Sequence, residues 1–516
     1  MLILASVLAV EVVLIQTKWL WLLRGGLFFV LVAGCPQAPE KASLINETVY
    51  ETCFEAEDCD DGYRCSTQGV AEIQLEAFEE GECREVSDLV GSAPSVWNWQ
   101  TGGIPLRDRL CSAQGLGTGG GDASDAIRRR QGELLDTIGV KPVRRAIHWE
   151  RVEPVKGEFD FGSFDPIVDF AQTNDLEVVW ILAYGNPWAT TQTTSEKWYP
   201  PDDPTDYADY ARVVAERYRG KVTRYELWNE ANAGYRFFKP NAHGDAALYA
   251  DMMYEASEAI HEVCPECTVI SGGLFQLEQV INGAIEFTHD MLTHRKDVFD
   301  HIDVFGVHPY TSYPPQFPPE LDGEGERALG GMLADIEAVL QLHDVPLMPF
   351  MTTEFGWPVY ETVSEQVQAD FLTRSVVLHA SLGVQLMCWF NLVDGVNAGA
   401  FPPEDDFGLF RYGAEDVSQD FALKPSGQAM QWLSQMGADL IPAGPNTTLA
   451  FHDPEEGRFA LDFDSAAGTV TVVWQVEGET PLQLEDERQC FTNTGGTLAT
   501  SNGSLMVSSS PVFLIP

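Results

Sequence analysis

The chain has 516 residues, which exceeds one ordinary domain and suffices for a large barrel with smaller modules. Apolar residues make up 45% of it, and 13 Trp and 28 Phe supply core material, so the composition is globular rather than disordered. Acidic residues outnumber basic ones 78 to 31, for a net charge of −47. A surface this negative repels phosphate backbones and anionic lipid head groups, which argues against nucleic acid as a partner.

Residues 1–34 predict an export signal. They are apolar apart from Glu11, Lys18 and Arg24, and they lead into LVAGC, which ends at Cys35. The small residues before this cysteine resemble the lipobox of bacterial lipoproteins, which implies that Cys35 is lipidated and becomes the mature N-terminus. An ordinary signal peptide or a transmembrane anchor stays open as an alternative. We expect an exported protein of the bacterial cell envelope, anchored to the outer membrane through the lipid or secreted.

Export makes disulfides possible, and the cysteine spacing predicts some. Residues 35–91 are acidic and hold too few apolar residues for a core, so we interpret them as a linker and a small module stapled by two bridges among Cys53, Cys59, Cys65 and Cys83. The three connectivities stay open, and metal binding is the less favoured interpretation because these four lack the close pairs typical of zinc sites. A local disulfide in an exposed loop is predicted for Cys264 and Cys267. The sequence offers no pairing for Cys111, Cys388 and Cys490.

Between residues 92 and 437, apolar strand-like runs alternate with helical patterns, several of which end in Gly as helix C-termini prefer. The Gly-rich run 114–124 lacks the context of a phosphate-binding motif and is interpreted as a loop. Eight strands alternating with helices are typical of a (β/α)8 TIM barrel. The predicted strands are residues 93–99, 143–149, 176–185, 222–230, 268–274, 302–310, 346–356 and 383–394.

Residues 438–516 have a different texture. Short alternating strands such as TVTVVWQV are separated by Gly, Asn and Asp turns, and no helical pattern appears. We therefore expect an α/β protein: a TIM barrel with a small C-terminal β-sandwich that packs against it and an N-terminal disulfide-rich module.

Polar and aromatic residues stand at the ends of the predicted barrel strands, where functional side chains of such barrels collect. Two carboxylates at one mouth are what cleavage of a glycosidic bond needs, because one protonates the leaving oxygen and the other attacks or stabilises the anomeric carbon. The candidates at or near strand ends are Arg144, Trp188, Asn229, Glu230, His308, Tyr310, Glu354 and Trp389.

Each candidate has a chemical reason. Arg144 and the Tyr310 hydroxyl can hold one carboxylate ionised by charge and hydrogen bonding. The Asn229 amide can bond a sugar 2-hydroxyl, and Trp188 and Trp389 offer flat apolar faces for the C–H surfaces of a sugar.

The tripeptides WNE (228–230) and HPY (308–310) and the segment TEFGWP (353–358), in this order and followed by Trp389, resemble a clan of retaining glycoside hydrolases with glutamates on strands four and seven. The resemblance covers about residues 92–516 and is closest to family 39 β-xylosidase-like members and family 5-like relatives. One departure is Ala231, where many relatives have Pro.

The resemblance implies that Glu230 is the acid/base and Glu354 the nucleophile. It implies that Asn229 contacts the 2-hydroxyl and that Tyr310 is the partner of the nucleophile. The remaining residues that it implies around the sugar are Arg144, with Arg145 as its rival, His308 and Trp389.

The sequence therefore predicts a retaining glycoside hydrolase for β-linked oligo- or polysaccharides, either β-xylosidase-like or β-glucanase/mannanase-like. Hydrolysis by two carboxylates needs no cofactor, and no metal-ligand cluster is visible in the sequence. The alternative is a non-catalytic surface lipoprotein that binds glycans in the barrel cleft. Sugar specificity and endo or exo action stay open.

Overall fold

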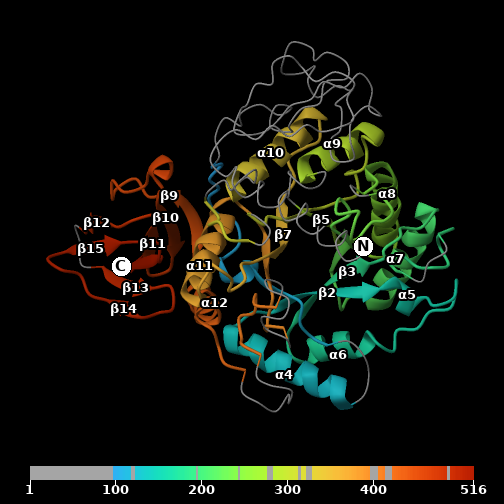
Figure 1. Cartoon of the computed structure of the whole chain (residues 1–516), viewed down its shortest axis with the longest axis horizontal. Coiled ribbons are helices and arrows are strands. Elements are labelled where there is room, and N and C mark those ends of the chain that lie inside the picture. The colour runs from blue at the N-terminus through green and yellow to red at the C-terminus, as the bar shows by residue number, and fades with distance from the viewer. Residues whose placement is uncertain are drawn as a thin grey trace, which may run out of the picture. The chain divides into compact units, whose positions relative to one another are not determined.

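Eight parallel strands form a closed barrel in the computed structural model of the chain (Figure 1). The last strand pairs with the first, and the strands in order are β1 Leu110–Ala113, β2 Pro142–His148, β3 Glu177–Ala183, β4 Arg224–Asn229, β5 Thr268–Phe275, β6 Phe305–His308, β7 Phe350–Phe355 and β8 Leu386–Phe390. The structure describes residues 97–117, 122–192, 196–241, 244–275, 283–311, 315–320, 328–395, 405–412, 421–484 and 488–516. The chain divides into two units, Met1–Gly91 and Ser92–Pro516, and the described residues belong to the second.

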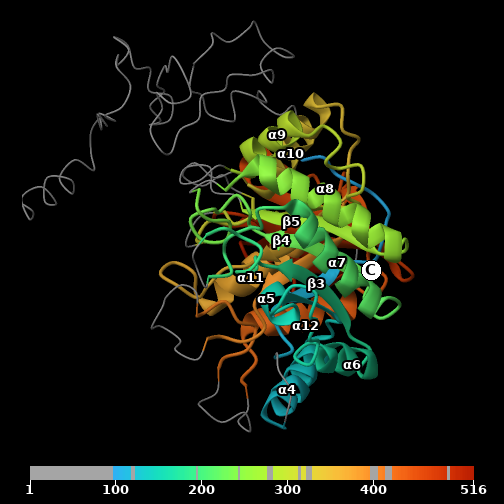
Figure 2. The same ribbon diagram turned by 90° about the vertical axis from the view of Figure 1, so that its right-hand side faces the viewer.

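Helices alternate with the strands, and α7 and α8 lie next to each other outside the barrel (Figure 2). The helix starts follow local capping rules. The Asp203 carboxylate accepts a hydrogen bond of 3.0 Å from the Thr205 amide, and Asp245 caps α8 in the same way. The helices are α4 Asp122–Ile138, α5 Trp149–Val152, α6 Asp165–Thr173, α7 Pro204–Tyr218, α8 Ala246–Val263, α9 Ala284–His294, α10 Leu329–Leu342, α11 Glu365–Ser381 and α12 Pro425–Met436.

The barrel strands are apolar because both of their faces are covered, one by the barrel interior and one by helices. In β3, with the sequence EVVWILA, every residue after Glu177 is buried. The predicted barrel is confirmed, and seven of its eight strands overlap the predicted ranges.

The first predicted strand, residues 93–99, is wrong. The strand at that place in the barrel is β1, with the short sequence LCSA, and the described residues 97–99 are not in a strand. Trp97 and Trp99 stack on each other at 5.1 Å, and they contact Phe459 and His452 of the C-terminal region. The apolar character of this run therefore serves packing against another part of the fold, while β1 is too short to show a pattern.

The C-terminal region forms two antiparallel sheets, shown in red beside α11 and α12 in Figure 1. One has six strands in the order β14-β13-β16-β11-β10-β9, and the other pairs β12 with β15. Side chains of both sheets share a core that includes Val473, Leu482, Leu505 and Leu514. The predicted C-terminal β-structure is confirmed, and its strands are β9 Ile441–Pro445, β10 Arg458–Ser465, β11 Gly468–Gln475, β12 Thr480–Gln483, β13 Gln489–Thr492, β14 Thr497–Leu498, β15 Ser504–Val507 and β16 Val512–Ile515.

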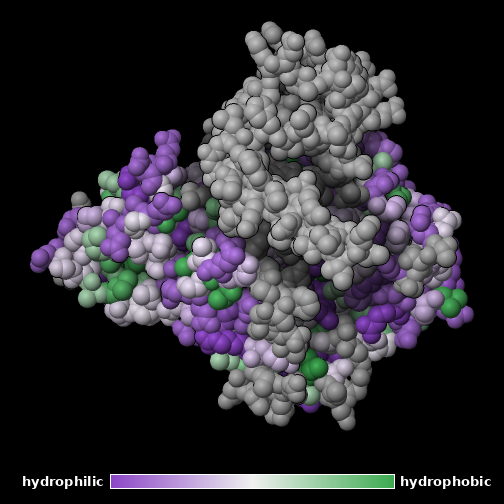
Figure 3. All heavy atoms as spheres, viewed as in Figure 1, coloured by the Kyte–Doolittle hydropathy of each residue, from purple (hydrophilic) through white to green (hydrophobic). Residues whose placement is uncertain are grey.

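The six-stranded sheet packs on the barrel through α11 and α12. The ring of Trp432 on α12 lies 5.5 Å from that of Phe491. On α11 the Asp370 carboxylate accepts hydrogen bonds from the Asn493 amide at 2.9 Å and the Ser510 hydroxyl at 2.8 Å. Hydrophilic residues dominate the visible face of the coloured, described part of the chain (Figure 3), as expected from its composition.

Two disulfides lie within the described residues. One joins Cys264 to Cys267, the local pair named from the sequence. The other joins Cys111 of β1 to Cys388 of β8, which are opposite each other where the barrel closes. The candidates Cys35, Cys53, Cys59, Cys65 and Cys83 lie outside the described residues. None of the helices in the described ranges has both the length and the apolar character that a membrane span requires.

Candidate active site

Most of the predicted site residues meet at the carboxyl ends of the barrel strands. Arg144 lies in β2, Asn229 and His308 end β4 and β6, and Glu354 is the penultimate residue of β7. Glu230 follows β4 directly, and Tyr310 follows β6 by two residues. Parallel strands bring their carboxyl ends to the same rim, so these residues converge although the chain separates them widely.

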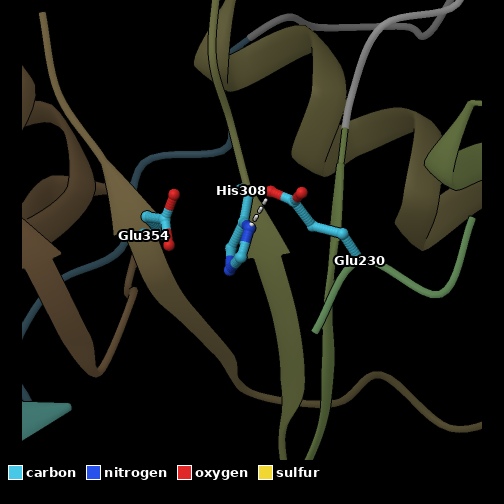
Figure 4. Close-up of side chains that lie close together, drawn as sticks. All are labelled: Glu230, His308 and Glu354. Carbon is cyan, nitrogen blue, oxygen red and sulfur yellow. Dashed lines mark hydrogen bonds and ion pairs between the residues drawn. The ribbon is translucent and has the colours of Figure 1, made fainter. Parts of the chain in front are cut away.

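The two glutamates face each other with a histidine between them (Figure 4). One oxygen of Glu230, one ring nitrogen of His308 and one oxygen of Glu354 all lie within 4.8 Å of one another. The His308 Nδ1 is 2.7 Å from Glu230 Oε1. Glu230 is buried, and the Glu354 side chain is 16% exposed. The two carboxylates therefore lie close together, and a small part of each side chain is exposed.

Glu354 accepts hydrogen bonds from two sides. The Tyr310 hydroxyl donates to its Oε1 at 2.8 Å, and Arg144 donates from Nη1 to its Oε2 at 2.9 Å. Both donors hold the carboxylate in one orientation, and the guanidinium places a full positive charge beside it. Burial, followed by the charges of Glu354 and Glu230, raises the pKa of Tyr310 well above its ordinary value, so this hydroxyl keeps its proton to donate.

Arg144 itself is held by a buried carboxylate that the sequence analysis did not single out. Its Nε and Nη2 donate to the two oxygens of Glu226 at 2.6 and 2.9 Å, and both side chains are almost fully buried. Nη2 also donates to the Asn229 side-chain oxygen at 2.7 Å. Burial opposes the charge on Glu226, but Arg144 outweighs it and lowers the pKa of Glu226 below its ordinary value. The arginine of the site is thus Arg144 and not its rival Arg145.

Two further residues complete the environment of Glu226. Its Oε1 accepts hydrogen bonds from the Gly273 amide at 3.0 Å and from the Thr353 hydroxyl at 2.9 Å. The Thr353 Oγ1 is also 3.1 Å from His308 Nε2. A signal for Glu226 exists in the sequence, because it is the one acid inside the apolar run of β4 and a buried acid needs a partner.

Backbone geometry sets the direction of Glu230. Trp228 and Glu230 have positive φ angles of 71° and 49°, a backbone conformation that residues other than Gly rarely adopt. The Glu230 amide donates to the Gly273 carbonyl at 3.0 Å, and the Trp228 ring nitrogen donates to the Phe237 carbonyl at 2.9 Å. Such conformations cost about 1–3 kcal/mol each and occur at functional sites that the surrounding structure holds in place.

Trp389 is a correction to the predicted sugar contacts. It is fully buried, its ring nitrogen donates to the Phe407 carbonyl at 3.0 Å, and its ring packs edge-on against Phe355. The next residue, Phe390, is only partly buried and contacts Phe407 at 5.3 Å, within the aromatic cluster that includes Tyr310. Successive residues of a strand point to opposite faces, so Phe390 is on the site's side and Trp389 is not.

The contacts of Trp188 are with residues other than the two glutamates. Its ring packs edge-on against Trp149 at 5.4 Å, Lys156 lies over it, and its ring nitrogen donates to the Glu153 carbonyl at 2.9 Å. The aromatic residue that sequence reasoning missed is Tyr184, which follows β3 and stacks on Phe237 at 5.7 Å.

The charges of the site reach Tyr184. Burial raises its pKa far above the ordinary value, with Arg144 opposing and the carboxylates of Glu230, Glu354 and Glu226 adding to the rise. The signal in the sequence was the place of Tyr184 at the end of the predicted strand 176–185.

Glu230, His308 and Glu354 are also the group among the described residues whose spacing a metal ion could use. The sequence could not show this, because the three come from different strands. Both ring nitrogens of His308 already have partners, Glu230 and Thr353, so a metal would have to displace one of them. The hydrogen bond between Glu230 and His308 fits a site that transfers protons better than a site that binds a metal ion.

Part of the barrel is similar in sequence to a family of glycoside hydrolases. The sequence profile of glycoside hydrolase family 42, described as beta-galactosidase, matches residues 123–236, a segment that includes Arg144, Asn229 and Glu230. A search of curated protein sequences finds no match.

Solved structures show the same fold. The chain is similar to a family 39 glycoside hydrolase from Bacteroides cellulosilyticus WH2, with a TM-score of 0.62 and 18% identity over 80% of this chain and 82% of that one. A monomeric beta-xylosidase from Caulobacter crescentus CB15 has a TM-score of 0.54 and 13% identity over 81% and 98%. An alpha-L-arabinofuranosidase from Thermotoga maritima has a TM-score of 0.53 and 13% identity over 81% and 98%.

Proposed function

We propose that the protein is a retaining glycoside hydrolase that cleaves β-glycosidic bonds by double displacement. The observation that carries this proposal is that oxygens of Glu230 and Glu354 lie within 4.8 Å of each other. Retaining enzymes hold their two carboxyl groups about 5–5.5 Å apart, whereas inverting enzymes leave about 6.5–9.5 Å for a water molecule. The profile match and the shared fold support the same class of enzyme.

The partners of the two glutamates assign their roles. Glu354 accepts hydrogen bonds from Arg144 and Tyr310, so it is the nucleophile that attacks the anomeric carbon. Glu230 faces an uncharged imidazole, because burial lowers the pKa of His308 to about 4. It protonates the leaving oxygen in the first step and takes a proton from water in the second.

The substrate is an oligo- or polysaccharide with β-linked sugars. Xylosides and galactosides are the first to test, because the similar structures include a beta-xylosidase and the matching family is described as beta-galactosidase. The rings of Phe237 and Phe390 are only partly buried and pack on the cluster that includes Tyr310, so they suit the C–H faces of a sugar. Export and lipidation at Cys35 stay predictions of the sequence.

Two substitutions test the roles on a panel of aryl β-glycosides. Glu354→Gln removes the nucleophile, so turnover should fall to background on every substrate that the wild type cleaves. Glu230→Ala should lose about 10²–10⁴-fold on a poor leaving group, keep a fast first step on a dinitrophenyl glycoside, and recover with azide as a β-glycosyl azide. Full activity of both variants would refute the proposal.

Two controls separate this function from its rivals. A chelator should leave activity unchanged, whereas loss of activity would favour a metal at the Glu230–His308–Glu354 group. Binding of a glycan without turnover of any substrate would favour the non-catalytic alternative.

A further inference from the structure

Four buried side chains form one hydrogen-bonded chain that ends at the proposed acid, Glu230. Glu226 Oε1 contacts Thr353 Oγ1 at 2.9 Å, Thr353 Oγ1 contacts His308 Nε2 at 3.1 Å, and His308 Nδ1 contacts Glu230 Oε1 at 2.7 Å. Glu226, Thr353 and His308 are inaccessible to solvent, and Glu230 is 7% exposed. Because each group has a fixed number of protons, the direction of every bond in this chain can be worked out.

The ionised end of the chain is Glu226. Arg144 donates to both of its oxygens and lowers its pKa, so Glu226 is a carboxylate that can only accept. Thr353 has a single hydroxyl proton, which it donates to Glu226. The Thr353 oxygen must then accept from His308, so Nε2 carries a proton.

The reverse arrangement costs more. If Thr353 donated to His308 Nε2, its oxygen would face Glu226 Oε1 at 2.9 Å with no proton between them. A bond to a buried carboxylate is stronger than one to a neutral imidazole, and a polar contact left without its proton is costly inside a protein. The arrangement with the proton on Nε2 is therefore preferred.

Glu230 must then supply the proton of the remaining bond. With one ring proton, already on Nε2, His308 presents a lone pair at Nδ1, and the 2.7 Å contact requires Glu230 to donate. The charged and titratable groups that face this pair are Arg144 from β2, Tyr184 after β3, Glu226 on β4, Tyr310 after β6 and Glu354 on β7.

Gly273 on β5 makes room for this chain. A Cβ atom at position 273 would lie 2.1 Å from His308 Nε2 and 2.6 Å from Thr353 Oγ1, so the contact between them exists only because this residue has no side chain. The Gly273 amide donates to Glu226, and its carbonyl accepts from the Glu230 amide. One residue thus aligns both ends of the chain.

From this geometry we propose that Glu226 and Thr353 are positioning residues that place the His308 proton on Nε2, so that Nδ1 accepts from Glu230 and keeps it protonated as the general acid. The inference rests on the function proposed above, and it adds an explanation of how Glu230 stays protonated until it acts as the acid. To protonate the leaving oxygen, Glu230 breaks its hydrogen bond to His308 Nδ1 and transfers this one proton. Nδ1 keeps its lone pair, and Glu230 becomes a carboxylate that can take the proton back from water in the second step.

The test compares Thr353→Val, which removes the hydroxyl at nearly constant shape, with Thr353→Ser, which retains it. In Thr353→Val the ring can place its proton on Nδ1 and donate to the Glu230 carboxylate, which favours the charged form. The alkaline limb of kcat/KM for a poor leaving group should move about one pH unit lower, so activity above it falls about tenfold. With a dinitrophenyl glycoside as the substrate, kcat/KM of Thr353→Val should fall by less. Thr353→Ser should show the same dependence of kcat/KM on pH as the wild type.

A second readout does not depend on activity. Nitrogen-15 NMR of the histidine rings, assigned with His308→Gln, should show the proton on Nε2 of His308 in the wild type and in Thr353→Ser, and on Nδ1 in Thr353→Val. A wild-type proton on Nδ1, or an unchanged tautomer and alkaline limb in Thr353→Val, would overturn the inference. If the wild type cleaves no glycoside, the proposed function fails, while the NMR measurement still decides the tautomer.

Discussion

At the scale of single residues, the site depends on the buried carboxylate of Glu226, which acts on Glu354 through Arg144. Glu226 holds Arg144 by two hydrogen bonds, and Arg144 reaches Glu354 with its remaining nitrogen. A guanidinium is planar and rigid, so fixing two of its nitrogens also fixes the third. The nucleophile on β7 is therefore oriented, through Arg144 of β2, by a residue on β4.

The Glu226→Gln variant tests this dependence. Removing one charge of a buried pair leaves Arg144 partly uncompensated, so we expect a loss of about 3–5 kcal/mol in the free energy of unfolding, together with lower kcat. Urea unfolding and kinetics on the same preparation measure both. The matched control is Glu365→Gln, which breaks a half-exposed pair with Arg411 and should cost less than about 1 kcal/mol. Equal losses of unfolding free energy in Glu226→Gln and Glu365→Gln would contradict the role of Glu226 as the buried partner of Arg144.

At the scale of elements, the barrel closes where its first and last strands meet. The strand β1 has four residues, and it pairs with β8 along its whole length. Cys111 and Cys388 face each other in this pairing and are joined, although 277 positions separate them in the chain. A cross-link between distant residues restricts the unfolded chain more than a local one does.

Removing this bridge should therefore destabilise the barrel. The double variant Cys111→Ala and Cys388→Ala is expected to lose up to about 5 kcal/mol, measured by thermal unfolding without reductant. The matched control is Cys264→Ala with Cys267→Ala, because that bridge spans a separation of only 3 and restricts little. A larger effect of the local bridge would contradict the argument.

At the scale of the whole molecule, buried imidazoles link stability to pH. Burial lowers the pKa of His289, His308 and His379 to about 4 each. An unfolded histidine titrates near 6.5, so between about pH 6.5 and pH 4 the unfolded chain binds protons that the folded chain does not. Stability is present above pH 6.5 and is lost as the pH falls to about 4.

His379 lies on α11, outside the site, and isolates this effect. The His379→Gln variant should show a smaller fall in unfolding free energy between pH 7 and pH 4, by up to about 3 kcal/mol. Comparing variant and wild type at each pH cancels the relief of acidic self-repulsion, which both chains share. His294→Gln, a half-exposed site, is the control and should follow the wild type. Identical curves for the wild type and His379→Gln would contradict the link.

The sequence by itself determined the local features. Apolar runs marked seven barrel strands because strands covered on both faces must be apolar, and Glu230 and Glu354 stood out because each ends or follows such a run. The order WNE, HPY, TEFG predicted one rim with two carboxylates. The short strand β1 was not predicted, because four residues are too few to show a hydrophobic pattern. The run that contains Trp97 and Trp99 was predicted as a strand, but these two rings pack on each other and on the C-terminal region.

Only the tertiary structure decided which of these residues touch. The chain Glu226–Thr353–His308–Glu230 crosses three strands, and a linear pattern does not specify contacts between strands. Whether Trp389 or Phe390 faces the site depends on the face of β8, because neighbouring residues point in opposite directions. The partner of Cys111 likewise depends on how the barrel closes. Sequence supplies the chemical groups, and closure of the barrel supplies their distances.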